Sequence, residues 1–425
     1  MEVLLQDLSP LPFISGVRYP LKGMAKLKVK LTRNLRKSIQ QGHPWVYREA
    51  ITPIRVEQAS LAQVSDTKGE LAWAIYDPHS PLALRILSTE SAPPSMANGF
   101  FPRRFERALA ARKSVISQTP GRETTAFRLF NGEGDLLPGL VCDVYGDIAV
   151  LQFDGQGPGE FWEKDEIAAW LLAHAPVKTV IEKTRRSTER TIRHLAGSEI
   201  KSVVADEPAT VIVQENGARY QVNLEKGQKT GFFLDQRDNR FYVRQSSAGK
   251  SVLNLFSYTG GFSISAGLGG AKLVASVDIS QGAIDMANEN WKLNGLDPSK
   301  HQGHAVDVFE FLKAIPKAAG DKWDHIIVDP PSMSHSEDRR EIAIQKYIDL
   351  FAVAAKGVKP HGELSLSSCS SHVSFDDFFK IITESMSQSR RRGQILRVSG
   401  QGSDHPFPHA CPELRYLKFV HLILD

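Results

Sequence analysis

The spacing of hydrophobic positions changes along the chain, and the spacing nearest the N-terminus predicts strands. Short apolar runs are separated by turn residues such as Asp, Pro and Gly. In Leu27–Leu31 apolar and basic side chains alternate, which is the period of a half-buried strand. Further strands are expected at Leu61–Val64, Leu71–Ile75 and Leu82–Leu87. Residues 26–95 therefore predict a small β-barrel.

The next segment mixes both periodicities. Ser91–Asn98 has the composition of a linker. It is followed by helical patterns at Phe101–Ser117 and Glu160–Ala173 and by strand patterns at Phe127–Phe130, Leu140–Val144, Ile148–Phe153 and Thr179–Glu182. Residues 96–205 predict a central α+β module.

From about Glu215 apolar strands alternate with helices. Buried strands are expected at Val252–Phe256, Leu273–Val277, His304–Val306, His325–Val328 and Leu364–Ser367. Helices are expected at Gly282–Leu293, Glu341–Ala355 and Phe375–Met386. This alternation predicts a doubly wound α/β sheet over residues 206–425. Residues 1–25 form an extension to which no role is assigned.

Composition narrows the class of protein. The 425 residues are 41% apolar and 24% charged, as in an ordinary globular chain. The chain has neither a long apolar run nor a signal peptide, so a cytoplasmic protein without a membrane span is expected. The chain has only three cysteines, Cys142, Cys369 and Cys411, and this odd, sparse number argues against a disulfide framework. None has a partner at C-x-x-C spacing, which argues against a structural zinc site. No metal is expected.

Charge is concentrated near the N-terminus. The net charge is only +4, yet no Asp or Glu occurs between Leu8 and Arg48. Such a stretch is either a solvated basic face or a surface for a polyanion. If the partner is RNA, the candidate phosphate-binding residues are Lys28, Lys30, Arg33, Arg36 and Lys37.

Ligands of a doubly wound sheet bind at the carboxyl ends of its strands. Gly260 and Gly261 follow the first strand, where they allow a tight turn and a close backbone approach to a ligand. Asp278 ends the second strand, 18 residues beyond Gly260, at the position of an acid that binds ribose hydroxyls. A simple turn and a helix N-cap, for which Ser280 competes, are the alternatives.

The later strand ends carry further polar residues. Asp307 follows the short third strand and is either a partner for the amine of an adenine or a helix cap. Asp329 begins Asp-Pro-Pro-Ser, a rigid acidic loop suited to holding a planar base, or a purely structural turn. Cys369 stands among serines, unlike a structural cysteine in an apolar core.

Together these motifs resemble those of a known family. The segment Asn254–Phe262, Asp278, Asp307 and Asp-Pro-Pro-Ser are similar to the motif series of class I S-adenosylmethionine-dependent methyltransferases. Residues 227–240 and the Ser-Cys-Ser, Asp-His-Pro and Pro-Glu motifs resemble bacterial ribosomal large subunit methyltransferase I. The resemblance implies a PUA RNA-binding domain, a central module and a Rossmann-like methyltransferase domain. It also implies S-adenosylmethionine as cofactor, bound by Asn254, Phe256, Tyr258, Thr259, Gly260, Gly261, Asp278, Asp307, Asp235 and Gln236.

The activity implied by the resemblance is C5-methylation of a cytosine in 23S rRNA. Cytosine C5 is a poor nucleophile, so a thiolate must first add to C6, and Cys369 has this role in the matching motif. Asp329 would hold the base, and Glu413 would remove the C5 proton, with His405 as an alternative. Cys411 stays open as a second nucleophile, and Phe232, Phe233 or Tyr258 would stack on an exposed base or belong to the core.

Other functions stay open. Relatives of the catalytic domain methylate guanine N7, which needs no thiol, and a small molecule or a protein is a further alternative substrate. A non-catalytic RNA-binding assembly factor would keep the same fold. A dehydrogenase is disfavoured because the glycine fingerprint is missing. The sequence is compatible with a homodimer and leaves the oligomeric state undecided.

Overall fold

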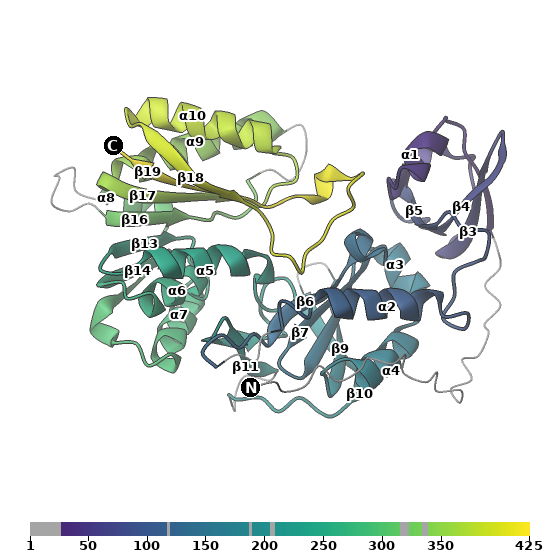
Figure 1. The fold of residues 1–425 in the computed structure, drawn as a ribbon, viewed down its shortest axis with the longest axis horizontal. Helices are drawn as coiled ribbons and strands as arrows, with labels where there is room; N and C mark the ends of the chain where they lie inside the picture. Colours follow the sequence, from purple (N-terminus) through teal and green to yellow (C-terminus); the bar gives the residue numbers. More distant parts are fainter. Residues whose placement is uncertain (1–26, 117–119, 187–188, 205–208, 315–322, 334–338) are drawn as a thin grey trace, which may run out of the picture.

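The computed structural model describes residues 27–116, 120–186, 189–204, 209–314, 323–333 and 339–425 (Figure 1). The expected extension, residues 1–25, lies outside these ranges. Three larger sheets and a two-stranded hairpin follow one another along the described chain. Within the described residues, no helix has both the length and the apolar character needed to cross a membrane.

The first sheet is a small closed barrel. Its strands follow the order β1-β3-β4-β5-β2, and a bridge from Leu31 to Ile51 joins the two edges. The expected strands are present, and the sequence pattern missed only the short β2 and helix α1. The elements are β1 (Leu27–Lys30), α1 (Arg36–Gln40), β2 (Trp45–Tyr47), β3 (Ser60–Asp66), β4 (Gly69–Tyr76) and β5 (Leu82–Ser88).

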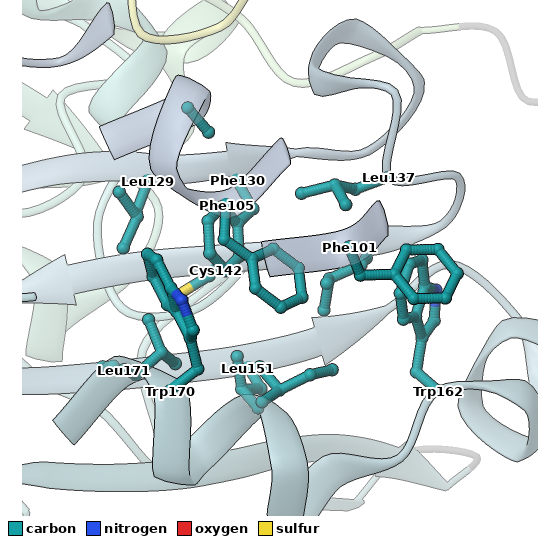
Figure 2. Close-up of a cluster of buried hydrophobic side chains, with 14 of the residues drawn as sticks. Phe101, Phe105, Leu129, Phe130, Leu137, Cys142, Leu151, Trp162, Trp170 and Leu171 are labelled. Carbon is teal, nitrogen blue, oxygen red and sulfur yellow. The ribbon is translucent and has the colours of Figure 1, made fainter. Parts of the chain in front are cut away.

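The second sheet, in the order β10-β9-β8-β7-β6, carries an aromatic core (Figure 2). Phe105 stacks on Phe130, and Cys142 is fully buried beside them. Trp162 interrupts the single helix expected over Glu160–Ala173, which is two helices in the structure. The elements are α2 (Phe100–Ala111), β6 (Ala126–Asn131), β7 (Leu140–Tyr145), β8 (Ile148–Phe153), α3 (Gln156–Phe161), α4 (Lys164–His174), β9 (Thr179–Arg186) and β10 (Glu189–Gly197).

A hairpin joins this sheet to the last one. Its strands are β11 (Thr210–Glu215) and β12 (Ala218–Asn223). Val213 and Tyr220 share one buried apolar cluster with Ile148 of the central sheet and Ile264 of the C-terminal domain. The hairpin therefore packs the two parts of the chain against each other.

The third sheet has seven strands in the order β15-β14-β13-β16-β17-β19-β18. The first five are parallel, whereas β19 runs antiparallel to both of its neighbours. Every residue of the central strand β13 is buried, as expected for a parallel strand covered on both faces. The strands are β13 (Ser251–Leu255), β14 (Leu273–Asp278), β15 (His301–Ala305), β16 (Trp323–Val328), β17 (Val358–Ser368), β18 (Gly393–Ser399) and β19 (Lys418–Leu424).

Helices cover both faces of this sheet (Figure 1). One apolar cluster packs α5, α6 and α7 on one face, and a second packs α8, α9 and α10 on the other. The predicted doubly wound α/β sheet is therefore confirmed. The helices are α5 (Arg237–Ser246), α6 (Gly261–Leu268), α7 (Gln281–Leu293), α8 (Val308–Ala314), α9 (Arg340–Lys356) and α10 (Phe375–Ser389).

The connection between β18 and β19, residues 400–417, leaves the sheet and crosses to the central module (Figure 1). Its Asp404 is fully buried, and the carboxylate accepts hydrogen bonds from Arg237 Nη1 (2.8 Å), the Arg128 backbone N–H (3.0 Å) and His405 Nδ1 (2.9 Å). Burial disfavours the charge, but His405 and Arg237 outweigh it and hold the pKa of Asp404 well below its usual range. The Asp404 carbonyl accepts a further bond from Arg112 Nη2 (2.9 Å).

The crossing requires a glycine on the central module. A Cβ atom on Gly134 would lie 1.9 Å from the Pro406 carbonyl oxygen, so no other residue fits without moving the backbone. Asn131 Nδ2 donates to the same carbonyl at 2.7 Å. The connection is thus fixed to the central module by close packing as well as by hydrogen bonds.

We predict that Asp404→Ala lowers the free energy of unfolding by about 3–5 kcal/mol, because the variant removes the buried partner of Arg237 and leaves its buried charge with only the half-buried Asp238. Urea unfolding at neutral pH measures the effect, and exposed Asp285→Ala serves as the control, with a change within about 0.5 kcal/mol. Since the pKa of Asp404 is lower in the folded chain than its ordinary value of 3.8, this contribution is present at neutral pH and is lost as the pH falls below that value. Equal stabilities of the two variants would contradict the prediction.

Candidate active site

Polar residues that follow the parallel strands meet at one edge of the third sheet. Residues 256–260 follow β13, Asp278 ends β14 and Asp307 comes after β15. Asp329 directly follows β16, and Cys369 directly follows β17. From β13 the strand order runs outward on both sides, through β14 to β15 on one side and through β16 to β17 on the other. This switch in strand order is where open α/β sheets bind their ligands.

The loop after β13 holds an unusual backbone conformation. Phe256 (φ 58°) and Tyr258 (φ 47°) both adopt the left-handed region, which bulky residues rarely occupy. Such strain costs about 1–3 kcal/mol per residue and clusters at functional sites. Gly260 (φ 84°) follows, and a Cβ atom there would lie 2.8 Å from Ile264 Cδ1 and 2.9 Å from Ala287 Cβ. The glycine is required because helix α6 starts against α7 at this point.

Asp278 holds this loop in place. Its carboxylate accepts hydrogen bonds from the backbone N–H groups of Tyr258 (2.9 Å) and Ser280 (3.0 Å). The N-cap of α7 is Ser280, whose hydroxyl accepts from the Ala283 N–H. Asp278 is therefore not the cap residue, and its half-buried carboxylate is placed beside the strained loop.

Asp307 has the alternative role that the sequence left open. It is exposed, and one carboxylate oxygen accepts from the N–H groups of Phe309 (2.8 Å) and Glu310 (3.2 Å) at the start of α8. Asp307 is thus a helix cap in this structure. Thr259 contributes its carbonyl to the Asn290 side chain (3.0 Å), which ties the loop to α7.

Gln236 and Asp235 come from a short 3₁₀ turn, residues 234–236, before α5. Gln236 Nε2 donates to Asp329 Oδ1 (3.0 Å) and to Ser367 Oγ (3.0 Å), so it orients the acid of the Asp-Pro-Pro loop. Asp235 Oδ2 accepts from Lys229 Nζ (2.6 Å) and from the Tyr416 hydroxyl (2.6 Å). Burial raises the pKa of Asp235, but Lys229 outweighs burial and the net shift is downward.

Asp329 and Cys369 are coupled electrostatically. Burial raises the pKa of Asp329 to about 6, so this carboxyl titrates near neutral pH. Burial and the neighbouring Asp329 charge raise the pKa of the half-buried Cys369 thiol to about 11. Acids and thiols with displaced pKa values in one pocket are typical of catalytic sites.

Lys418, which sequence reasoning did not single out as a site residue, belongs to the same cluster. Its side chain is 1% exposed, and Nζ donates to the carbonyls of Ser370 (2.5 Å) and Tyr416 (2.7 Å). Burial lowers the pKa of Lys418 to about 8, although the Cys369 thiolate opposes this shift. The lysine starts the antiparallel strand β19, so only the fold brings it beside the end of β17.

Glu413 lies in a different environment from the one its expected role requires. Donor atoms of Glu413, Cys411 and His43 lie within 4.8 Å of one another, at the contact with the N-terminal barrel. Among the described residues, no hydrogen bond or ion pair joins Glu413 to Cys369 or Asp329. Cys411 is fully buried, and burial together with Glu413 raises the pKa of its thiol to about 12.

The basic residues of the barrel divide into two groups. Lys28, Lys30 and Lys37 are exposed, and Arg33 makes only an exposed ion pair with Glu49 (3.7 Å). Arg36 instead forms two hydrogen bonds to Asp66 (2.7 and 2.6 Å) and a third to the Gly69 carbonyl. Arg36 is therefore held within the barrel, and its guanidinium is less available to a phosphate than the exposed lysines.

Comparison with known proteins matches this architecture. A family of S-adenosylmethionine-dependent methyltransferases matches residues 165–380, and a PUA-like domain matches residues 29–89. A ribosomal RNA large subunit methyltransferase from Deinococcus radiodurans is 36% identical over 412 residues, which cover 96% of this chain and 99% of the relative. Ribosomal RNA large subunit methyltransferase I from Tolumonas auensis is 34% identical over 397 residues, covering 92% and 97% of the two chains.

A solved structure also has a similar fold. A methyltransferase crystallised with S-adenosylhomocysteine is 26% identical and has a TM-score of 0.79, and the match covers 94% of this chain and all of the other. Fold and comparisons together define an S-adenosylmethionine-dependent methyltransferase preceded by a PUA-like domain. More narrowly, the chain belongs to the ribosomal RNA large subunit methyltransferase I family. The expected fold class, family and cofactor are confirmed.

The residues at the strand ends fit this cofactor. Asn254 Nδ2 donates to Ser263 Oγ (2.9 Å), while Asn254 Oδ1 and Ser257 Oγ are buried without a hydrogen-bond partner. Asp235 Oδ1 is a third buried oxygen in this state. Buried polar atoms are nearly always paired, so unpaired oxygens around the loop favour a ligand with several donors. The amine and ribose hydroxyls of S-adenosylmethionine supply such donors.

We predict that Asp278→Ala weakens binding of S-adenosylmethionine at least tenfold, because the variant loses both an acceptor and the anchor of the strained loop. Asp307→Ala is the comparison, since it removes an acid from the same edge that caps a helix. Isothermal titration measures both affinities, and circular dichroism checks folding. Unchanged affinity in folded Asp278→Ala would show that this acid does not serve the cofactor.

Proposed function

We propose that this chain transfers the methyl group of S-adenosylmethionine to C5 of a cytosine in 23S rRNA. The names of the relatives support a ribosomal RNA substrate. Support for cytosine C5 comes from one observation: Cys369 and Asp329 stand at the ends of paired strands, β17 and β16, beside the cofactor loop. A guanine N7 enzyme needs no thiol at this place, because N7 carries its own lone pair.

Cys369 is proposed as the nucleophile and Asp329 as the group that holds the cytosine at N3 and N4. As the sulfur bonds to C6, Asp329 takes the thiol proton and passes it to N3. This addition makes C5 electron-rich. The bound cofactor supplies the methyl group, which C5 accepts. A base then removes the C5 proton, the sulfur–C6 bond breaks, and the N3 proton returns to the thiolate.

His405 is proposed as the base in place of Glu413. Its Nδ1 donates to the buried Asp404 carboxylate (2.9 Å), an arrangement that fixes the ring and supports a positive charge on it. The His405 ring also lies close enough to act electrostatically on Asp235, a member of the Cys369 cluster. Glu413, in contrast, groups with Cys411 and His43.

The elevated thiol pKa sets a second requirement. With a pKa of about 11, Cys369 is a protonated thiol at neutral pH, and the reactive thiolate must be stabilised when it forms. Lys229 and Lys418 are the cations whose charges lower the pKa of this thiol, Lys229 more strongly, and Lys418 is the buried one of the two. We assign Lys418 the role of positioning and stabilising the sulfur through the Ser370 carbonyl and its own charge.

The N-terminal barrel is proposed to bind RNA. A cavity of about 240 Å³ lies between α1 and β2, lined in part by Arg33, His43, Trp45 and Tyr47. Aromatic rings beside cationic side chains suit exposed bases and phosphates of RNA. Lys28, Lys30 and Lys37 extend the positive surface around this barrel.

We further propose that the chain divides into domains at residues 26–95, 96–205 and 206–425, that the protein is cytoplasmic and that it forms a homodimer. The methyltransferase match begins at residue 165, so it includes the last part of the central module together with the catalytic domain. A second copy would find apolar side chains on the edge strand β18, where Ile395, Leu396 and Val398 are about half exposed.

We predict that Cys369→Ala abolishes 5-methylcytosine formation in 23S rRNA but retains S-adenosylmethionine binding. Labelled methyl transfer followed by nucleoside mass spectrometry measures the product, and Cys411→Ala is the matched control expected to keep activity. A methylated guanine from both variants would favour the N7 alternative. Binding of RNA without any methyl transfer by the wild type would favour the assembly-factor alternative.

Lys418→Met should lower kcat most below about pH 8, where the Lys418 ammonium is still protonated and can stabilise the forming thiolate, and the variant and wild-type profiles should converge at higher pH. Wild-type kcat is expected to rise with pH as the thiol ionises. The KM for S-adenosylmethionine should stay unchanged. A uniform loss of kcat at all pH values would mean that Lys418 acts only in packing.

A further inference from the structure

A second polar cluster is buried in the C-terminal sheet, at the end opposite to the candidate active site. It consists of His325 on β16, Glu363 on β17 and His421 on β19. His325 lies four residues before Asp329 on its strand, a separation of about 13 Å. The cluster belongs to the face covered by α5, whose Tyr242 ring lies 5.0 Å from the His421 ring. Nothing in the proposed methyl transfer uses these side chains.

One donor atom from each residue points to a common centre. Glu363 Oε2 lies 3.7 Å from His325 Nδ1 and 3.7 Å from His421 Nε2, and all three donor atoms lie within 4.8 Å of one another. The two histidines are 0% and 1% exposed. Around a tetrahedral zinc ion, ligand atoms bound at about 2.0–2.2 Å are separated by about 3.3–3.6 Å. A small side-chain adjustment therefore reaches metal-binding geometry.

The atoms of each side chain that face away from the common centre are already hydrogen-bonded. Ser365 Oγ lies 2.8 Å from His325 Nε2 and 2.9 Å from His421 Nδ1, so one hydroxyl orients both rings. Lys250 Nζ lies 2.5 Å from Glu363 Oε1, which turns Oε2 toward the histidines. Outer hydrogen bonds that fix the unused ring nitrogen and the unused carboxylate oxygen are the usual support of metal ligands.

Two of the atoms that face the common centre lack the hydrogen-bond partners that the outer atoms of the same side chains have. His325 Nδ1 and Glu363 Oε2 are buried without a hydrogen-bond partner. A single proton between the carboxylate and one ring still leaves the lone pair of the other ring facing the carboxylate. A cation satisfies all three donors together, and burial makes the unsatisfied arrangement costly.

We propose that His325, Glu363 and His421 bind a divalent cation, with Zn²⁺ as the ion that suits two imidazoles and one carboxylate, and with water as a fourth ligand. The site contains no cysteine, and for this reason the cysteine spacing of the sequence gave no sign of it. The ion would join β16, β17 and β19. The opposite ends of these strands carry Asp329, Cys369 and Lys418. The ion would therefore stabilise the relative positions of the strands that hold the catalytic cluster.

Zinc uptake by the full chain tests this proposal without any activity assay. The protein is freed of metal with a chelator, titrated with ZnCl₂ in a calorimeter, and then desalted for metal analysis by mass spectrometry. The wild type is expected to bind one Zn²⁺ per chain and to gain thermal stability from it. Glu363→Gln and His421→Gln should lose at least tenfold in affinity and lose the thermal shift, and circular dichroism checks that both fold.

Two controls separate this site from other donors. His304→Ala removes a histidine from the edge strand β15, and Cys411→Ser removes the thiol of the cluster at the barrel contact; both should bind zinc like the wild type. The proposal is overturned if the wild type takes up no zinc, if both cluster variants keep it, or if only Cys411→Ser loses it.

Discussion

The geometry of the candidate active site depends on the buried carboxylate of Asp404. This one acid accepts from a side chain at the start of α5, from the backbone of the central module and from its own neighbour His405. Residues 400–417 are consequently fixed against the central module before the chain re-enters the sheet at Lys418. The position of Tyr416 above Asp235 follows from this crossing. A carboxylate that takes no part in the proposed bond changes therefore determines what surrounds the cofactor loop.

Two neighbouring buried carboxyl groups have pKa values that are displaced in opposite directions. Asp235 is held ionised by Lys229, whereas Asp329 has a pKa of about 6 because it receives less compensation for burial. Carboxyl groups with different environments take different roles: Asp235 stays charged and accepts hydrogen bonds, whereas Asp329 exchanges a proton near neutral pH. Cys369 and Lys418 complete the arrangement, as each makes the charged state of the other less costly.

The sequence predicted those features that depend on local pattern. Parallel strands place their carboxyl ends together, so Asp278, Asp329 and Cys369 could be assigned to one edge from their positions alone. Strand β18 was missed because an edge strand exposes most of its side chains.

Long-range partners could not be predicted in this way. Only the fold shows that Arg36 is held by Asp66 and that Glu413 lies at the barrel contact. Likewise, Lys418 reaches Ser370 across 48 positions of sequence. Asp307 was left between two roles because an acid at a strand end is equally suited to capping the next helix.

The most direct test of the account is to trap the covalent step. A 23S rRNA fragment containing 5-fluorocytidine at the target position is incubated with the protein and S-adenosylmethionine, since fluorine at C5 cannot leave as the proton does. The account predicts a stable protein–RNA adduct that carries one added methyl group, and peptide mass spectrometry should locate it on Cys369. Methylation of RNA by a chain that never forms this adduct, or an adduct on Cys411, would contradict it.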